Sequence, residues 1–501
     1  MVLRFAIKTL GCKVNQYDAQ AVAAVLESAG FLPADRDAGP STDLLVVHTC
    51  CVTATAMRKS RQAIRRALRR SPQAAILIAG CYGDYDGRRL RAMLAELNVP
   101  PRRVAFAGHH GDVAACVEQF ARDLRGSDGA GPDRSRIRAE PRGDDGCMSA
   151  PCDARITASP ASIRTRRKAA VKANVPGASR LPPLRHFAGH HRAFVKVQDG
   201  CDAFCAYCVV PYTRPRVGSR SPGDIVAECR RLVAAGHREI VLCGVFLGAF
   251  GRSTAVRRRW PDAPSPLGDL LRRVAGIDGL WRVRLSSIEP GDVTDDLLAA
   301  FGELPNAAPH FHLPLQSGSR RILRRMNRQY TAREYRRTVD RVRSALDRPA
   351  VTTDVIVGFP GETEEDFAAT LDAARHAGFA KIHAFPFSPV EGTAAWTYRH
   401  EAAPPQAVRA RLARLAELEA QLAADYRRSF VGETMEALVE GPPRRGRKGT
   451  ASHQAMTDRY LTVAFPPPPG PDDLTGRIVR LHVDAVTSAG LAGTLEEPLD
   501  G

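Results

Sequence analysis

The chain has 501 residues, 44% of them hydrophobic and 25% charged, and its formal net charge is +18. This composition excludes a disordered or fibrous protein. At about 150 residues per domain, a chain of this length is expected to form about three domains with sizeable cores. The chain contains no apolar run of about 18 residues, so the sequence predicts no membrane span. The N-terminus lacks a secretory signal pattern, so we expect a cytoplasmic protein with no membrane partner. The basic charge favours RNA or DNA as a partner, although an Arg-rich chain is also typical of a GC-rich genome.

Residues 1–122 alternate between strand and helix patterns. Three short apolar runs, RFAIKTLGC, DLLVVHTCC and AAILIAGCY, are each followed by a helical pattern. This order predicts an α/β domain, with a parallel sheet and crossover helices. One of the helices, AMRKSRQAIRRALRR, is heavily basic on its polar face. Such a face is either an ordinary solvated surface or one that contacts RNA, with Arg58, Arg61, Arg65 and Arg69 as the candidate contacts.

The rest of the chain divides into three further segments. Residues 123–185 are rich in Gly, Pro, Ser, Arg and Asp and lack an apolar period, which predicts a disordered basic insertion or linker. Residues 186–428 again alternate strands and helices. Residues 429–496 switch to a period of two, which predicts a small antiparallel β-barrel with the basic turn RRGRKG between two of its strands.

Cys201, Cys205 and Cys208 form a group of closely spaced thiols in GCDAFCAYC. Thiolates select zinc or an iron–sulfur cluster. A structural zinc site needs a fourth ligand, and the candidates for it are His186, His190 and His191. A four-iron cluster held by only three thiolates instead leaves one iron open, where a substrate can bind through amino and carboxylate groups. Both alternatives are open on the spacing alone.

A second group of cysteines is not visible as a local motif. Cys12, Cys50 and Cys81 each stand directly after an apolar strand. Because the carboxyl ends of parallel strands share one edge of a sheet, we expect these three thiols to converge on one site. Cys51 has the opposite side-chain direction if the strand persists. We therefore expect it not to be a ligand, and expect the same of the remaining cysteines: Cys116, Cys147, Cys152, Cys229 and Cys243.

Further motifs accompany these cysteines. SSIEP, HLPLQSGS and DVIVGFPGETEEDF follow GCDAFCAYC, whereas TLGCKVNQYDAQ, VVHTC and IAGCY precede it. In this order and combination they resemble the radical S-adenosylmethionine (SAM) methylthiotransferase family, and the C-terminal barrel resembles the family's TRAM RNA-binding domain. The resemblance covers everything except residues 123–185. It implies a partial (βα) barrel for residues 186–428.

The resemblance also implies the cofactors. Cys201, Cys205 and Cys208 would hold a [4Fe–4S] cluster whose open iron chelates SAM and cleaves it to a 5′-deoxyadenosyl radical. Cys12, Cys50 and Cys81 would hold an auxiliary [4Fe–4S] cluster carrying the sulfur or methylthio group. SAM would serve both as methyl donor and as radical source, with electrons from a donor such as flavodoxin or ferredoxin. Strand-end residues would contact SAM: Gly244, Ser286, Ser287, Glu289, Gln316, Ser317 and Asp354.

GCKVNQYD resembles the branch of the family that acts on N6-threonylcarbamoyladenosine, just 3′ of the tRNA anticodon, so the implied partner is the anticodon stem-loop. Some residues depart from the family pattern: His48 replaces Asn, Cys243 replaces Thr, and Pro215 and Gly218 alter a loop near the cluster. The alternatives are isopentenyladenosine in tRNA, an aspartate of a ribosomal protein and, in another class, a non-catalytic zinc-containing RNA-binding protein.

Overall fold

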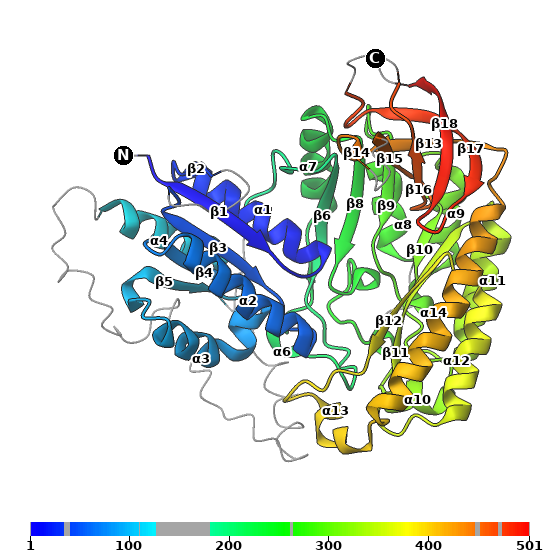
Figure 1. The fold of residues 1–501 in the computed structure, drawn as a ribbon, viewed down its shortest axis with the longest axis horizontal. Helices are drawn as coiled ribbons and strands as arrows, with labels where there is room; N and C mark the ends of the chain where they lie inside the picture. The colour runs from blue at the N-terminus through cyan, green and yellow to red at the C-terminus, as the bar shows by residue number, and fades with distance from the viewer. Residues whose placement is uncertain are drawn as a thin grey trace.

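The computed structural model describes residues 2–34, 41–109, 111–126, 181–260, 264–445, 451–468 and 473–499. Figure 1 shows an N-terminal domain (blue), a central α/β domain (green to yellow) and a β-structure at the C-terminal end (red). The expected disordered insertion and the tip of the RRGRKG turn lie mostly outside the described residues; positions 123–126 continue a helix. No helix in the described ranges is long and apolar enough to span a membrane.

The N-terminal domain contains a parallel sheet in the order β2-β1-β3-β4-β5, as the apolar runs predicted. Its strands are β1 (Arg4–Thr9), β2 (Leu32–Pro33), β3 (Leu44–Thr49), β4 (Ala75–Gly80) and β5 (Val104–Ala107). Its helices are α1 (Lys13–Ser28), α2 (Ala54–Arg70), α3 (Cys81–Glu96) and α4 (Val113–Gly126).

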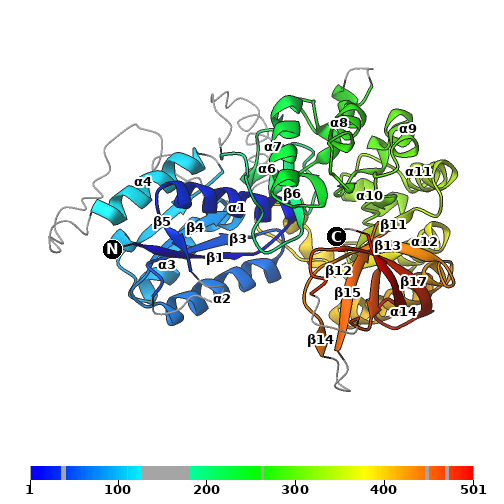
Figure 2. The ribbon, with the colours of Figure 1, turned by 90° about the horizontal axis from the view of Figure 1, so that it is seen from above.

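Helices cover both faces of this sheet (Figure 2). Alternate residues of β3 point to opposite faces, so Leu44 and Val46 pack in one apolar cluster with α1 and α4, whereas Leu45 and Val47 pack in another with α2 and α3. A strand buried on both faces reads as a continuous apolar run rather than an alternating one. This is why the sequence signals these strands clearly.

The central domain is a partial barrel of parallel strands, which confirms the expected fold class. Two sheets, β7-β6-β8-β9 and β10-β11-β12, meet where Val283 of β9 bridges to Ala307, just before β10. The strands are β6 (Arg192–Asp199), β7 (Gly218–Ser219), β8 (Glu239–Gly244), β9 (Arg282–Leu285), β10 (His310–His312), β11 (Ala350–Val357) and β12 (Lys381–Pro386). The short β7 runs antiparallel to β6.

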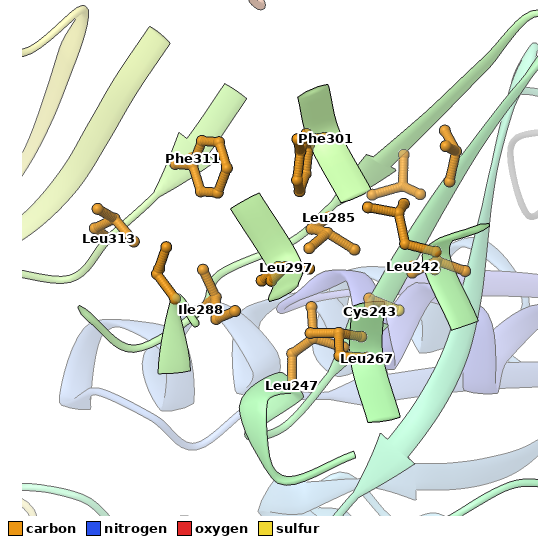
Figure 3. Packing of buried hydrophobic residues seen from close by; sticks show 14 of the residues in the cluster. Leu242, Cys243, Leu247, Leu267, Leu285, Ile288, Leu297, Phe301, Phe311 and Leu313 are labelled. Atoms are coloured by element: carbon orange, nitrogen blue, oxygen red, sulfur yellow. The ribbon is translucent and has the colours of Figure 1, made fainter. Parts of the chain in front are cut away.

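The helices of this domain pack outside the strands. They are α6 (Val210–Thr213), α7 (Pro222–Ala234), α8 (Pro266–Ala275), α9 (Asp295–Glu303), α10 (Arg320–Arg325), α11 (Ala332–Ala345), α12 (Glu364–Ala377), α13 (Ala394–Thr397) and α14 (Pro405–Arg428). Figure 3 shows Leu242 and Cys243 of β8, Leu285 of β9 and Phe311 of β10 in the apolar core against α8 and α9. Cys243 therefore packs as a small apolar side chain.

The C-terminal strands close into a small barrel, as expected. They are β13 (Thr434–Val439), β14 (Arg444–Arg445), β15 (Ala451–Thr457), β16 (Thr462–Phe465), β17 (Ile478–Val486) and β18 (Leu491–Pro498). Because β13 pairs with both β17 and β15, five strands form a ring, and β14 extends its edge. The expectation of an antiparallel barrel was wrong in one place: β16 and β18 pair in parallel, because β17 runs opposite to β16 and the chain then turns back in β18.

The small barrel docks on the N-terminal ends of β8 and β9. Arg284 of β9 is fully buried; its Nε donates to Glu239 at 2.9 Å, and its Nη2 donates to the Thr457 carbonyl of the barrel at 3.2 Å. Its guanidinium lies 3.7 Å from the ring centroid of Tyr460. The barrel is thus fixed at the strand ends opposite Cys201, which follows the C-terminal end of β6.

Candidate functional site

Cys12, Cys50 and Cys81 lie at the C-terminal edge of the N-terminal sheet. Cys12 is the N-cap residue of α1, Cys81 is the first residue of α3, and Cys50 follows β3 shortly before α2. Helix N-termini carry partial positive charge, which stabilises thiolates. Cys12 and Cys81 therefore lie at helix N-termini, although burial raises the pKa of the Cys12 thiol, and Cys50 precedes Thr53, the N-cap residue of α2.

The side chains of these residues come together. Cys50 interacts electrostatically with Cys12 and Cys81, and Cys12 interacts with Cys81. Gly11, at φ 111°, makes room for this approach, because a Cβ at that position would lie 3.3 Å from the Cys50 sulfur. Ser60 of α2 fixes Cys50, accepting from its N–H and donating to its carbonyl, both at 3.1 Å. The convergence is present, and the role as cluster ligands stays a prediction.

Cys51 is fully buried among the apolar residues of α2 and α3. A hydrogen bond between the Cys51 and Cys81 thiols lowers the pKa of Cys81 well below its usual value and raises the pKa of Cys51. Cys51 therefore lies beside the group and supports Cys81, whereas Cys50 faces both Cys12 and Cys81.

The loop that carries Cys201, Cys205 and Cys208 is held in one shape. Gly200 has φ 76°, and a Cβ there would lie 1.7 Å from the Arg216 carbonyl oxygen, so only glycine fits. Phe204 also has a positive φ of 50°. Asn327 donates to the carbonyls of Ala203 at 3.1 Å and Phe204 at 2.9 Å. The turn is thus fixed from outside the loop.

The chemistry of both donor sets fits a thiolate-ligated cluster. Cys201 interacts electrostatically with Cys205 and Cys208. Burial raises the pKa of Cys208 and of Cys50 to about 12, so these thiols are protonated at neutral pH unless a cationic centre binds them. The neighbouring Asp202 carboxylate is already bound, accepting from the Thr254 hydroxyl and the Ala255 N–H at 2.6 Å. Sulfur is therefore the donor that the loop offers.

The two cysteine groups face each other across the interface between the N-terminal and central domains. Cys208 and Cys81 are close enough to interact electrostatically. Arg214 is buried between the domains and donates from Nε to the Cys81 sulfur at 3.4 Å. Its other nitrogens pair with Asp18 of α1 at 2.7 Å and Asp199 of β6 at 2.8 Å. These buried ion pairs join the domains beside Cys81.

A second buried arginine contacts the other group. Arg328 donates from Nη1 to the Cys205 sulfur and to the Tyr207 hydroxyl, each at 3.2 Å, and its Nη2 pairs with Glu289. Sequence reasoning missed both Arg214 and Arg328. In a chain with 72 Lys and Arg residues, a single arginine carries no local signal, and these contacts form between residues more than 120 positions apart.

The residues expected to contact SAM lie at the C-terminal strand ends. Gln316 has φ 58° and is buried, and its Oε1 has no hydrogen-bond partner within the described ranges. Asp354 of β11 lies 3.3 Å from His312. Glu289 is bound by Arg328, as above. A buried acceptor without a partner is the feature that a bound ligand would explain best.

The other expected contacts differ in exposure. Ser286 is buried, Ser287 is exposed, and Gly244 is half-buried at the end of β8. Ser317 is fully buried, and its hydroxyl accepts from the Ser319 N–H at 3.2 Å. The roles of these residues stay predictions. The hydrogen bond of the Ser317 hydroxyl to the Ser319 N–H is one that stabilises a turn.

The zinc alternative for Cys201, Cys205 and Cys208 does not fit the fold. His186 packs against His237, which lies just before β8; His190 packs against Phe187, and His191 directly precedes the first residue of β6. Cys201 follows the opposite end of β6, whose length is about 26 Å at about 3.3 Å per residue. Within the described ranges, no three His, Cys, Asp or Glu residues are arranged to hold a single metal ion.

Known proteins resemble the chain at both cysteine groups. Residues 195–374 match the radical SAM superfamily, and residues 4–99 match the uncharacterized protein family UPF0004. The chain is 34% identical to the threonylcarbamoyladenosine tRNA methylthiotransferase MtaB of Chlamydia pneumoniae, over 98% of each chain. It is also 34% identical to the tRNA-2-methylthio-N(6)-dimethylallyladenosine synthase of Parafrankia sp., over 89% of this chain and 80% of that protein.

A solved structure has a fold similar to that of this chain over most of the length of both proteins. It is the radical S-adenosylmethionine methyltransferase TsrM from Kitasatospora setae, with cobalamin and a [4Fe–4S] cluster bound. The TM-score is 0.50 at 16% identity, covering 79% of this chain and 77% of that one. At this identity the likeness concerns the arrangement of the elements alone.

Proposed function

Because the chain belongs to the radical SAM tRNA methylthiotransferases, we propose that it converts N6-threonylcarbamoyladenosine beside the tRNA anticodon into its 2-methylthio derivative. The observation that carries this proposal is that Arg214 joins the two cysteine groups: its carbonyl accepts from the Cys201 N–H at 3.1 Å, and its Nε donates to the Cys81 sulfur at 3.4 Å. Sulfur insertion requires the sulfur-delivering and radical-generating groups to reach the same carbon atom, and effective catalysis depends on such positioning.

We infer that the two cysteine groups hold two [4Fe–4S] clusters. Cys201, Cys205 and Cys208 would hold the one that binds SAM, and Cys12, Cys50 and Cys81 would hold the auxiliary one. With SAM, these groups supply radical hydrogen abstraction and the transfer of sulfur and methyl. The protein supplies position and surroundings: the Cys201 loop is fixed by Asn327, and a buried arginine lies on one sulfur of each group.

The residues at the strand ends would orient SAM. Gln316 is the best supported, because a hydroxyl or amino group of the ligand would satisfy its buried Oε1. Glu289 and Asp354 offer carboxylates whose present partners are Arg328 and His312. Ser317 would act through the turn rather than by contact. The proposed set is that of the sequence: Gly244, Ser286, Ser287, Glu289, Gln316, Ser317 and Asp354.

Two relatives bear on the choice of base. The chain spans 98% of the threonylcarbamoyladenosine enzyme but 80% of the dimethylallyladenosine enzyme, at the same identity of 34%. The coverage and the GCKVNQYD segment favour the first, and the equal identity makes the second the alternative. Either base lies in the anticodon loop, where it can be splayed into a site that a base inside a duplex does not reach.

The proposed units are residues 1–122 for the auxiliary cluster, 186–428 for the radical SAM core and 429–496 for RNA binding, with electrons from a donor such as flavodoxin or ferredoxin. The test is mass spectrometry of tRNA nucleosides from cells with and without the gene. Loss of the 2-methylthio form of N6-threonylcarbamoyladenosine supports the proposal. Loss of the 2-methylthio form of N6-dimethylallyladenosine instead would show that this base is the substrate.

A further inference from the structure

We propose that the exposed face of α2 is a docking surface for the phosphate backbone of RNA, leading away from the cysteine site. The inference rests on the proposed tRNA function and names the surface that would hold the RNA. Between Ala54 and Arg70 the helix contains no acidic residue but seven basic ones: Arg58, Lys59, Arg61, Arg65, Arg66, Arg69 and Arg70.

The helix presents these cations to solvent. Its buried positions are Ser60, Ile64 and Leu68. All of the basic side chains are exposed except Arg61, which is half-buried and donates to the Tyr82 hydroxyl at 2.5 Å. The apolar stripe therefore holds α2 on the sheet, and the opposite face is left almost entirely cationic.

Some arginines on other helices have acidic partners. Arg336 of α11 pairs with Asp372 at 2.5 Å, and Arg272 of α8 pairs with Glu303 at 2.8 Å. In contrast, no acidic residue in the described part of the chain pairs with these α2 cations: Arg58, Lys59, Arg65, Arg66 and Arg69. Like charges three or four residues apart destabilise a helix, so a row of cations without an acidic residue among them is a cost that a bound polyanion would offset.

The position of α2 connects this charge to the site. The helix begins just after Cys50, and its Ala54 N–H donates to Ser388 at 2.9 Å, in the loop after β12. It extends about 25 Å from there, at about 1.5 Å per residue. A strand whose base enters the site can therefore continue along the helix.

The chemistry of the surface suits a phosphodiester. The uncharged exposed residues of α2 are Ala54, Thr55 and Gln62. A protein interface needs a buried apolar centre, which these residues do not offer, whereas arginine binds phosphate well.

The test uses the full chain and a labelled anticodon stem-loop carrying N6-threonylcarbamoyladenosine. Arg65, Arg66 and Arg69 are changed together to Gln, which keeps helix propensity and removes three charges. The matched control changes Arg333, Arg336 and Arg337 of α11 to Gln, on the other side of the molecule (Figure 1). Binding is measured by fluorescence anisotropy over a series of salt concentrations.

We expect the α2 variant to bind the RNA at least about tenfold more weakly. The slope of the logarithm of the binding constant against the logarithm of the salt concentration should be smaller by about 2 to 3, because each lost phosphate contact lowers that slope by about 0.7 to 0.9. The control should keep the slope, and both variants should keep RNA-independent SAM cleavage. If the unchanged protein modifies this RNA but the two variants bind alike, the surface proposal is overturned and the function stands. If the unchanged protein does not bind the RNA at all, both fail.

Discussion

Arg284→Met tests whether a buried ion pair fixes the small barrel to the core. The change removes the donors to Glu239 and to the Thr457 carbonyl but keeps most of the side-chain volume. Breaking a buried pair costs about 3 to 5 kcal/mol. Glu239 keeps Arg282 at 3.2 Å, which argues against a larger loss. At about 2 to 4 °C per kcal/mol, the apparent melting temperature should fall by about 6 to 20 °C.

The fluorescence of Trp281 reports on this interface, because its indole N–H donates to Glu436 of the barrel at 3.2 Å. Replacing Trp260 and Trp396 with Phe isolates that signal. The control is Arg272→Met, which removes more exposed pairs with Glu303 and Asp296 and should leave the melting temperature almost unchanged, because solvent screens such pairs.

The loss should depend on pH. The Arg284 and Arg282 guanidinium groups lower the pKa of Glu239 against the opposing effect of its burial. A lowered folded pKa gives stability that is present above the unfolded value of about 4.3 and is lost as pH falls through the folded value. The difference in melting temperature between the unchanged protein and the Arg284→Met variant should therefore be largest at pH 7 and smaller at pH 4. An equal gap at both pH values, or melting like the Arg272 variant, would refute the ion-pair explanation.

Three further changes test the cysteine site. Cys50→Ala should remove about half of the iron from anaerobically reconstituted protein, whereas Cys51→Ala should retain it, because only Cys50 faces both Cys12 and Cys81. The reverse result would make Cys51 the ligand. Gly200→Ala should also lose about half of the iron through the clash with the Arg216 carbonyl, while Gly218→Ala, whose Cβ meets nothing within 4 Å, should not. Arg214→Met should lower the stability of the metal-free protein by at most about 3 to 5 kcal/mol, because Asp18 and Asp199 lose the guanidinium but keep Lys196, and Arg214→Lys should recover part of the loss; equal melting of all three proteins would contradict this.

Local sequence patterns predicted the parts of the fold that depend on local physics. The apolar runs before Cys50 and Cys81 identified strands buried on both faces, and the shared edge of a parallel sheet then predicted that their thiols converge. The period of the apolar residues and the direction of the strands determine where the carboxyl ends of these strands lie. The prediction that Cys51 is not a ligand is untested: β3 ends at Thr49, so the strand does not continue through Cys51, and the Cys51 thiol hydrogen-bonds to the Cys81 thiol.

Contacts between distant segments were out of reach of the same patterns. Arg214 and Arg328 touch cysteines far away in sequence, so their roles depend on how the domains and loops pack. The parallel pairing of β16 with β18 depends on ring closure rather than on either strand. The hydroxyl of Ser317 bonds to the Ser319 N–H in its own turn and to the Thr370 hydroxyl of α12, which its place in the HLPLQSGS motif does not reveal.

The most direct test of the central claim is a paired reaction with the reduced, reconstituted enzyme and SAM. One tRNA carries N6-threonylcarbamoyladenosine, the other carries isopentenyladenosine, and both are digested for nucleoside mass spectrometry. The account predicts a 2-methylthio product from the first tRNA only. A product from the second alone would contradict the substrate assignment, and methylthiolation of a ribosomal protein with neither tRNA modified would contradict the RNA assignment itself.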